Sequence, residues 1–428
     1  MTDIDFRSLL GAGAVEASRA PTALTGRELQ DLVSPLSTQA FVDSYFSRTS
    51  VSVKGHPHKF DHIFGWERLR QAIARGKSLS GTSYNIKAAF THGEEVGDAQ
   101  RMLDAEPGQI GELLDKGATI CITDIHLADP VLAQWAQAVR AQLNFTGLVG
   151  VNCYVSPDGS GLPTHYDKRV ATSIQISGKK YWRYSLESAK PWPLENAVYQ
   201  PASDGAIDPA IGTSPAKMAF GEVVLEAGDL LCLPAGAWHA ARGIGHSLAL
   251  NVYFSPQNFI HQLAPLIQHL AVQSGSWRGG PPATLEKVQG DMPTAVTDYM
   301  RQRFDEVCEI AAEAWLSSLA QEPYKGWKPE PLLPLPGIAP DQRFRIAATL
   351  LRYVRSDEGL LVACDNGMLR FPDTMAPIFQ RLSAEEAGFT IPDVLSWQTS
   401  ADGPSREQIL QALKTLFSNG LMKLAQEQ

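Results

Sequence analysis

Alternating apolar and polar residues dominate the chain from about residue 148 to residue 254, in short runs that Gly and Pro separate. Alternation with a period of two is the pattern of a β-strand that buries one face. Many such runs in succession predict an antiparallel sandwich or jelly roll. Two of the runs, 170–176 and 180–186, flank a short segment centred on Gly178, which predicts a hairpin. Residues 187–219, rich in Pro, Ala and Ser, predict an insertion over the mouth of this barrel.

On both sides of this block the apolar residues recur every three or four positions, which predicts helices. Before the block, the pattern predicts helices at 37–46 and 129–143, with a strand at 50–54. After it, helices at 259–272 and 296–319 predict an all-helical unit. Such a unit beside a β-domain suits dimerisation, and helices that simply pack on the barrel are the alternative.

The C-terminal part follows a proline-dense segment, residues 323–340, which predicts a stiff linker. Beyond it the order of elements suggests a winged-helix fold: a helix at 344–354, a strand pair at 359–364 and 368–371, and helices near 373–382 and 405–417. The chain as a whole is predicted to comprise an N-terminal arm (1–35), a cupin-like domain (36–256), a helical domain (257–322), the linker (323–340) and a winged-helix-like domain (341–428).

The charge of the chain argues against a nucleic-acid partner. Its 428 residues are 44% apolar and 19% charged, an ordinary globular mixture, with a net charge of −9. This balance excludes a polybasic binder and leaves a basic substrate open. In the candidate recognition helix, Arg406 and Lys414 are few and Glu407 opposes them, so we do not expect direct DNA binding.

The cysteines and the N-terminus predict a soluble cytoplasmic protein. The five Cys are widely spread and form no CxxC pair, so reduced thiols are expected rather than a disulfide framework or a zinc site. The N-terminus carries early acidic residues and no signal-peptide pattern. No apolar run is long enough to cross a bilayer, so we expect no membrane partner.

The strongest chemical signal is a pair of histidines with an aspartate. His165 and Asp167 stand two apart in a strand pattern, so both side chains should point to one face. His239 follows a short apolar strand that a Pro/Gly turn closes. Two imidazoles and one carboxylate are the ligand set of a non-haem Fe(II) oxygenase, and they leave metal positions open. A surface His-Tyr-Asp with a capping His is the alternative.

A second requirement is a source of electrons. The chain has no GxGxxG dinucleotide motif, so a 2-oxo acid is the expected cosubstrate. Its distal carboxylate would need a cation in a dry pocket, where an unpaired charge is costly. Lys180 is the candidate because it shares a strand face with Trp182 and Tyr184. The pattern alone leaves open whether Lys180 points inward or is solvated like Lys179.

Three polar residues are further candidates for contacts with the cosubstrate. Tyr154 and Thr164 could donate hydroxyl hydrogen bonds to its carboxylate. Asn251, on the strand after His239, could bind the cosubstrate or a metal-bound water. For each of the three, a hydrogen-bonded core residue without a ligand is the alternative.

Residues 152–167, 175–183 and 228–239 resemble JmjC-type 2-oxoglutarate oxygenases. They look closest to the cupin-like branch that contains the ribosomal oxygenases, which hydroxylate side chains of ribosomal proteins. Residues 41–46 and 60–64 resemble the N-terminal helix and loop of that branch. The resemblance implies a double-stranded β-helix core, a helical dimerisation domain that would make the protein a homodimer, and a C-terminal winged helix.

The resemblance also implies the site. Fe(II) would be held by His165, Asp167 and His239, and the C5 carboxylate of 2-oxoglutarate by Lys180 with help from Tyr154. The activity implied is hydroxylation of a protein or peptide side chain, with a ribosomal protein as one candidate. Succinate and CO2 would be the by-products.

Two features depart from a bacterial ribosomal oxygenase and leave the target open: the insertion at 187–219 and the basic pair Lys168 and Arg169. A hydroxylase of a small molecule or peptide natural product is therefore one alternative. N-methyl-lysine demethylation is another, although no aromatic cage is evident. A non-catalytic cupin that binds a metal or ligand is the third.

Overall fold

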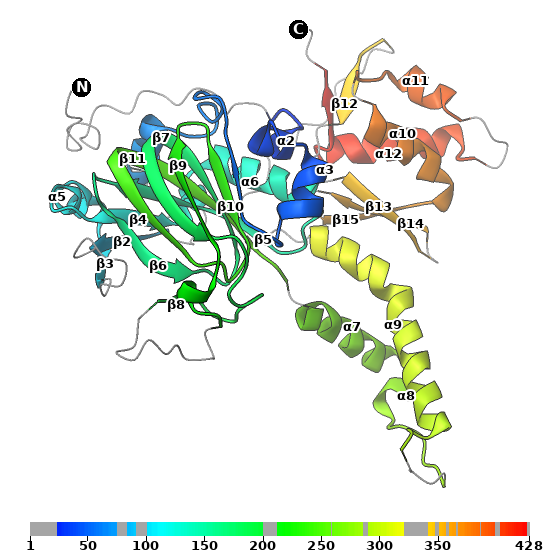
Figure 1. Cartoon of the computed structure of the whole chain (residues 1–428). Coiled ribbons are helices and arrows are strands. Elements are labelled where there is room, and N and C mark those ends of the chain that lie inside the picture. Colours follow the sequence, from blue (N-terminus) through cyan, green and yellow to red (C-terminus); the bar gives the residue numbers. More distant parts are fainter. Residues whose placement is uncertain are drawn as a thin grey trace. The chain divides into compact units, whose positions relative to one another are not determined.

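The computed structural model divides into two compact units, whose main boundary lies between Pro256 and Gln257 (Figure 1). Asn144–Thr146 belong to the second unit. The structure describes residues 24–74, 84–90, 101–199, 212–257, 259–285, 290–320, 341–346, 351–356, 359–364, 367–385, 387–398 and 403–425. The predicted linker at 323–340 lies outside these residues.

The first unit is built on one antiparallel sheet that folds over itself (Figure 1). Two long strands, β7 (Val170–Ser185) and β11 (His239–Ser255), run through its centre. The main order is β1-β10-β7-β11-β5-β4-β2-β3, with β6 attached to β11, β8 attached to β6, and β9 attached to β7. The other strands are β1 (Val51–Val53), β2 (Asn85–Phe90), β3 (Arg101–Ala105), β4 (Thr119–Thr123), β5 (Leu148–Ser156), β6 (Gly161–Tyr166), β8 (Ala197–Val198), β9 (Phe220–Glu226) and β10 (Leu230–Leu233). This confirms the predicted antiparallel sandwich and is consistent with a double-stranded β-helix.

The predicted hairpin around Gly178 is wrong, because β7 continues through it as a single strand. Its first half pairs with β10, where Ile174 faces Leu230, and its second half pairs with β9, where Lys180 faces Leu225. Gly178 has a φ of +70°, and a Cβ there would lie 1.9 Å from the carbonyl oxygen of His246. The glycine therefore allows a bend and a close backbone approach, and β7 passes from one wall of the sandwich to the other.

Helix α6 (Pro130–Gln142) covers the outer face of β5. It begins at Asp129, whose carboxylate accepts hydrogen bonds from two backbone N–H groups of the first turn. Alternate residues of β5, among them Val151 and Cys153, are fully buried, and the residues between them face the interior. The remaining helical segments of this unit are α2 (Glu28–Val33), α3 (Thr38–Ala40), η1 (Phe41–Tyr45), α4 (Trp66–Ala74), η2 (Pro107–Gln109), α5 (Ile110–Asp115), η3 (Ile125–Ala128) and η5 (Pro215–Lys217). Helix α2, inside the predicted N-terminal arm, packs on α6.

The insertion at 187–219 is described over 187–199 and 212–219, and these parts pack on the outer side of strands β6 and β11. Tyr166 and Trp238 are buried there with their ring centroids 4.6 Å apart. Trp238 also donates a hydrogen bond from Nε1 to the carbonyl oxygen of Thr213. Each of the two aromatic residues is the chain neighbour of a predicted metal ligand, so the insertion packs against the residues next to those ligands.

The second unit begins with the predicted helices, observed as α7 (Phe259–Gln273) and α9 (Thr294–Ala320), with the short α8 (Gly275–Arg278) between them. Helices α7 and α9 lie side by side (Figure 1). Among the described helices of the chain, none is long and apolar enough to cross a membrane.

The predicted helix at 344–354 is wrong. Its described residues form two strands, β12 (Phe344–Ile346) and β13 (Leu351–Ser356). Leu351 and Tyr353 pack on the hydrophobic core of this part, so the side chains alternate as in a strand. The predicted strand pair is observed as β14 (Gly359–Cys364) and β15 (Gly367–Phe371), and the two predicted helices as η6 (Asp373–Met375) with α10 (Ala376–Ala384), and as α12 (Arg406–Ser418). The structure adds α11 (Ile391–Ser396) and β16 (Met422–Leu424), which the sequence did not predict.

Candidate active site

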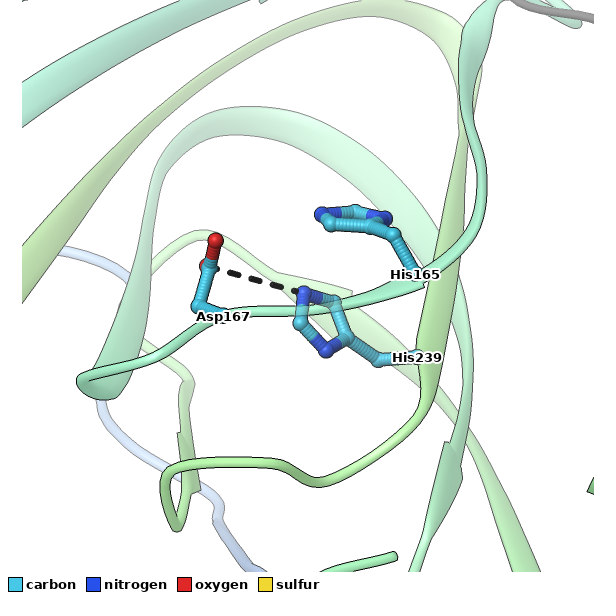
Figure 2. Close-up of side chains that lie close together, drawn as sticks. All are labelled: His165, Asp167 and His239. Carbon is cyan, nitrogen blue, oxygen red and sulfur yellow. Dashed lines mark ion pairs between the residues drawn. The ribbon is translucent and has the colours of Figure 1, made fainter. Parts of the chain in front are cut away.

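The structure brings the side chains of His165, Asp167 and His239 together (Figure 2). His165 is near the end of β6, Asp167 follows that strand, and His239 begins β11, where it is the register partner of His165. One ligand atom from each side chain lies within 4.8 Å of the other two. The two imidazole centroids are 4.2 Å apart, and His239 Nε2 is 4.0 Å from Asp167 Oδ2. Two imidazole nitrogens and a carboxylate oxygen fit Fe(II), and they leave coordination positions open.

Backbone contacts set the tautomers of both imidazoles. His165 Nδ1 lies 2.8 Å from the carbonyl oxygen of Pro163, and His239 Nδ1 lies 2.9 Å from that of Ala237. A carbonyl oxygen can only accept, so each Nδ1 carries the proton and donates it. Each Nε2 is then left with a free lone pair, which is the form that binds a metal.

The charge state of His239 suits the same role. Burial, and next the neighbouring His165, lower the pKa of His239 to about 4, while the negative charge of Asp167 works in the opposite direction. The imidazole is therefore neutral near pH 7. A neutral imidazole is a metal ligand, so no proton has to be displaced from His239 on binding.

Asp167 is held by two neighbours from different parts of the chain. The backbone N–H of Gly236 donates to the Asp167 carbonyl oxygen at 2.8 Å. The side chain of Asn196, in the insertion, donates from Nδ2 to Asp167 Oδ1 at 2.9 Å. The strand-like spacing places Asp167 near His165, but both of these contacts depend on distant segments.

A cavity of about 450 Å³, counting its open mouth, extends from the three side chains into the sandwich. Its floor and walls come from both halves of the folded sheet. The residues that line it are Thr119, Tyr154, Gly161, Leu162, His165, Asp167, Ser173, Lys180, Trp182, His239, Ala241 and Asn251. The predicted metal ligands and the predicted cosubstrate lysine therefore share one cavity.

The sequence left open whether Lys180 points inward or into solvent. In the structure the residue is only 4% exposed and lines the cavity, so it points inward. Burial lowers the pKa of Lys180 to about 8. Among the described residues, no carboxylate lies within ion-pair distance of it, and its Nζ is 5.5 Å from the centroid of the Tyr154 ring. A buried ammonium without an anionic partner is costly, and an anionic ligand in the cavity would remove that cost.

Some polar groups of the cavity wall are hydrogen-bonded, and others among the described residues are not. Tyr154 is hydrogen-bonded to Cys121 and Asn251, and burial raises its pKa well above its ordinary value. Within the described part of the chain, Asn251 Oδ1 and Trp182 Nε1 are buried and have no hydrogen-bond partner. Such atoms are rare in folded proteins, and a bound polar ligand would satisfy them. The cavity thus fits a small polar anion.

One predicted residue is not brought to the cavity. Thr164 is buried, but it is not among the residues that line the cavity, although its neighbour His165 is. Thr119 and Ser173 supply hydroxyl groups to the cavity instead. Neither carries a sequence signal, because each reaches the cavity only through the pairing of β4 with β5 and of β7 with β11.

Most of the residues that line this cavity lie in a segment that matches a known family model. Residues 127–261 match the family model of the JmjC domain. Ribosomal oxygenase 1 of Gallus gallus is 25% identical over 309 residues, which cover 69% of this chain and 48% of that protein. The bifunctional lysine-specific demethylase and histidyl-hydroxylase NO66 of Drosophila yakuba is 27% identical over 321 residues, which cover 72% of this chain and 45% of that protein. The matched part thus spans just under half of each relative.

The fold is also shared with a solved structure. YcfD, described as a ribosomal oxygenase from Escherichia coli in complex with cobalt and 2-oxoglutarate, superposes with a TM-score of 0.55 at 14% identity. The superposition covers 92% of this chain and 99% of that chain. At this identity the similarity shows the fold alone.

Proposed function

We propose that this JmjC-domain protein is an Fe(II)- and 2-oxoglutarate-dependent dioxygenase that hydroxylates a side chain of a protein or peptide. The JmjC match over residues 127–261 supports the family resemblance and the enzyme class expected from the sequence. One observation carries the proposal: His165, Asp167 and His239 converge in the cavity that also contains the buried Lys180, which has no carboxylate partner among the described residues.

The three ligand side chains would hold iron, which supplies the oxygen-activating chemistry that protein side chains lack. The chain's own contribution is to present the donors in the right form. The Nδ1–H groups of the histidines are occupied by backbone carbonyls, and Asp167 is fixed by Gly236 and Asn196. Donors oriented in this way have less conformational freedom to lose when the metal binds.

The inner end of the cavity would bind the distal carboxylate of 2-oxoglutarate. Lys180 would neutralise it, and Tyr154, Thr119 and Asn251 supply hydrogen-bonding groups on the same wall. The bound carboxylate would displace water from that end of the cavity. The open mouth would be left for the side chain to be hydroxylated.

The names of the relatives favour a protein substrate. One is called a ribosomal oxygenase and another a bifunctional demethylase and histidyl-hydroxylase. A ribosomal protein is therefore the first candidate for this chain. The basic pair Lys168 and Arg169 follows the proposed metal ligand Asp167 and departs from the bacterial ribosomal oxygenases. A substrate other than a ribosomal protein would account for this difference.

The direct test is succinate formation by the purified chain with Fe(II), ascorbate and 2-oxoglutarate, with ribosomal proteins added as substrate. We expect succinate and a ribosomal protein that gains the mass of one oxygen, and neither with the His239→Ala variant. Succinate that appears only with a small-molecule extract would favour the natural-product hydroxylase. Failure to bind both Fe(II) and 2-oxoglutarate would favour a non-catalytic cupin.

The low pKa of Lys180 predicts a pH dependence. Its pKa lies at about 8, below the ordinary 10.5, so the free enzyme loses the ammonium charge as the pH rises through 8. Because binding of a dicarboxylate needs that charge, the affinity for 2-oxoglutarate should fall by about tenfold per pH unit above that point. Calorimetric titration with 2-oxoglutarate at several pH values measures this. The Lys180→Arg variant keeps its proton and should show no such loss; a wild type without the loss contradicts the prediction.

We also propose that helices α7 and α9 form the interface of a homodimer. They expose large apolar side chains, including Val272 (78% exposed), Phe304 (59%) and Met300 (45%). Apolar side chains gathered on a helix pair favour association with a matching surface. Phe304→Asp should convert a dimer into a monomer in light scattering, and Glu309→Ala, an exposed change on the same helix, should not. A wild type that is monomeric at all concentrations contradicts the proposal.

The part of the chain from residue 341 onward is proposed to be a winged helix that serves in protein interaction rather than in DNA binding. Its helix α12 exposes Arg406 and Lys414 together with Glu407, so the face is not uniformly basic. A DNA-binding helix normally presents a cluster of positive charges to the phosphates.

A further inference from the structure

The insertion is joined to the strand that carries the metal ligands. Its short strand β8 pairs with β6, so that Val198 faces His165 and Ala197 faces Tyr166. The backbone N–H of Tyr199 donates to the carbonyl oxygen of Thr164 at 2.8 Å. These contacts hold the preceding residue, Asn196, beside the loop that follows β6.

Asn196 makes two hydrogen bonds across this junction. Its Nδ2 lies 2.9 Å from Asp167 Oδ1, and its Oδ1 lies 2.9 Å from the backbone nitrogen of Lys168. An ionised carboxylate can only accept and a backbone N–H can only donate. The two contacts therefore determine which end of the amide faces which partner, and both bonds are satisfied together.

The two oxygens of the Asp167 carboxylate therefore have different surroundings. Oδ1 is occupied by Asn196, and Oδ2 is the oxygen that lies 4.0 Å from His239 Nε2. The carboxylate thus presents one oxygen to the ligand cluster and has the other tied back. The backbone of Asp167 is held separately, by the N–H of Gly236. Loss of the Asn196 side chain would therefore free the carboxylate and the Lys168 N–H, while the Asp167 carbonyl oxygen stays bonded to Gly236.

We propose that Asn196 is a positioning residue: it fixes the rotation of the Asp167 carboxylate, so that a single oxygen is offered to the metal. The inference rests on the proposed function, and it gives the insertion a role in the metal site. It is also independent of what the insertion does with the substrate. Partners that orient metal ligands affect metal affinity as well as activity.

The test uses Co(II) titration of the purified full chain, followed by visible absorption. In Asn196→Leu, which keeps the approximate volume but removes both hydrogen bonds, the dissociation constant for Co(II) should rise by about 10- to 100-fold. Asn196→Ala should behave in the same way. The melting temperature of the metal-free protein should change little in both variants, because Asn196 is exposed.

Two controls separate the possible failures. Leu194→Ala changes a side chain in the same segment that is 86% exposed and should leave Co(II) binding as in wild type. Wild-type affinity in Asn196→Leu, or an equal loss in Leu194→Ala, overturns the role of Asn196 and leaves the proposed function intact. A wild-type protein that binds no more Co(II) than His239→Ala does overturns the proposed function and this inference together.

Discussion

Replacing Asp167 by alanine should lower the rate of succinate formation by more than about 100-fold, which is the upper end of the cost of losing an outer partner of a metal ligand. Asp167 is the one negatively charged member of the proposed ligand set, and its Oδ2 lies 4.0 Å from His239 Nε2. Without it, two neutral imidazoles remain, and they suit other metals as well as iron. Coupled detection of succinate with saturating 2-oxoglutarate measures the loss.

A second substitution separates charge from shape at this position. Asp167→Asn keeps the volume of the side chain and removes its negative charge, so it should lose nearly as much activity as Asp167→Ala. Glu195→Ala changes an exposed acidic residue in the neighbouring insertion and should keep full activity. Full 2-oxoglutarate turnover in Asp167→Ala would remove Asp167 from the ligand set.

The second large effect is expected at Lys180. Removing one partner of a buried charge pair costs about 2 to 5 kcal/mol, which corresponds to about a 30-fold or greater loss of affinity. Lys180→Ala should therefore raise the KM for 2-oxoglutarate by at least that factor and change kcat much less. The reason is that the lysine lies in the cavity, buried and without a carboxylate partner among the described residues.

The adjacent lysine is a matched control. Lys179 is 54% exposed and pairs with Glu226 on the surface, so Lys179→Ala should leave the KM nearly unchanged. Lys180→Met offers a second check, because it keeps the length of the side chain and removes the cost of a buried charge. The ligand-free variant should melt at a higher temperature than wild type. An unchanged KM in Lys180→Ala would exclude the lysine from cosubstrate binding.

The hydrophobic pattern alone was sufficient to predict the secondary structure where one period continues over many residues. The strands between residues 148 and 254 and the helices α7 and α9 follow from alternation and from helical spacing. It failed at two places of mixed signal. Gly178 looked like a turn but allows a bend in β7, and the apolar residues around Leu351 looked helical but form strands. A glycine marks close approach as readily as it marks a turn.

The sequence by itself determined which three side chains form the candidate metal-binding cluster. His165 and Asp167 are two apart on a strand, so local geometry places them on one face, and His239 follows a strand end that the Pro/Gly turn identifies. Only the tertiary structure decided which other groups meet them. The direction of Lys180, the exclusion of Thr164 and the contact of Asn196 with Asp167 depend on pairing between distant segments. Spacing along a chain specifies the face of a strand, whereas strand register and packing determine what lies opposite that face.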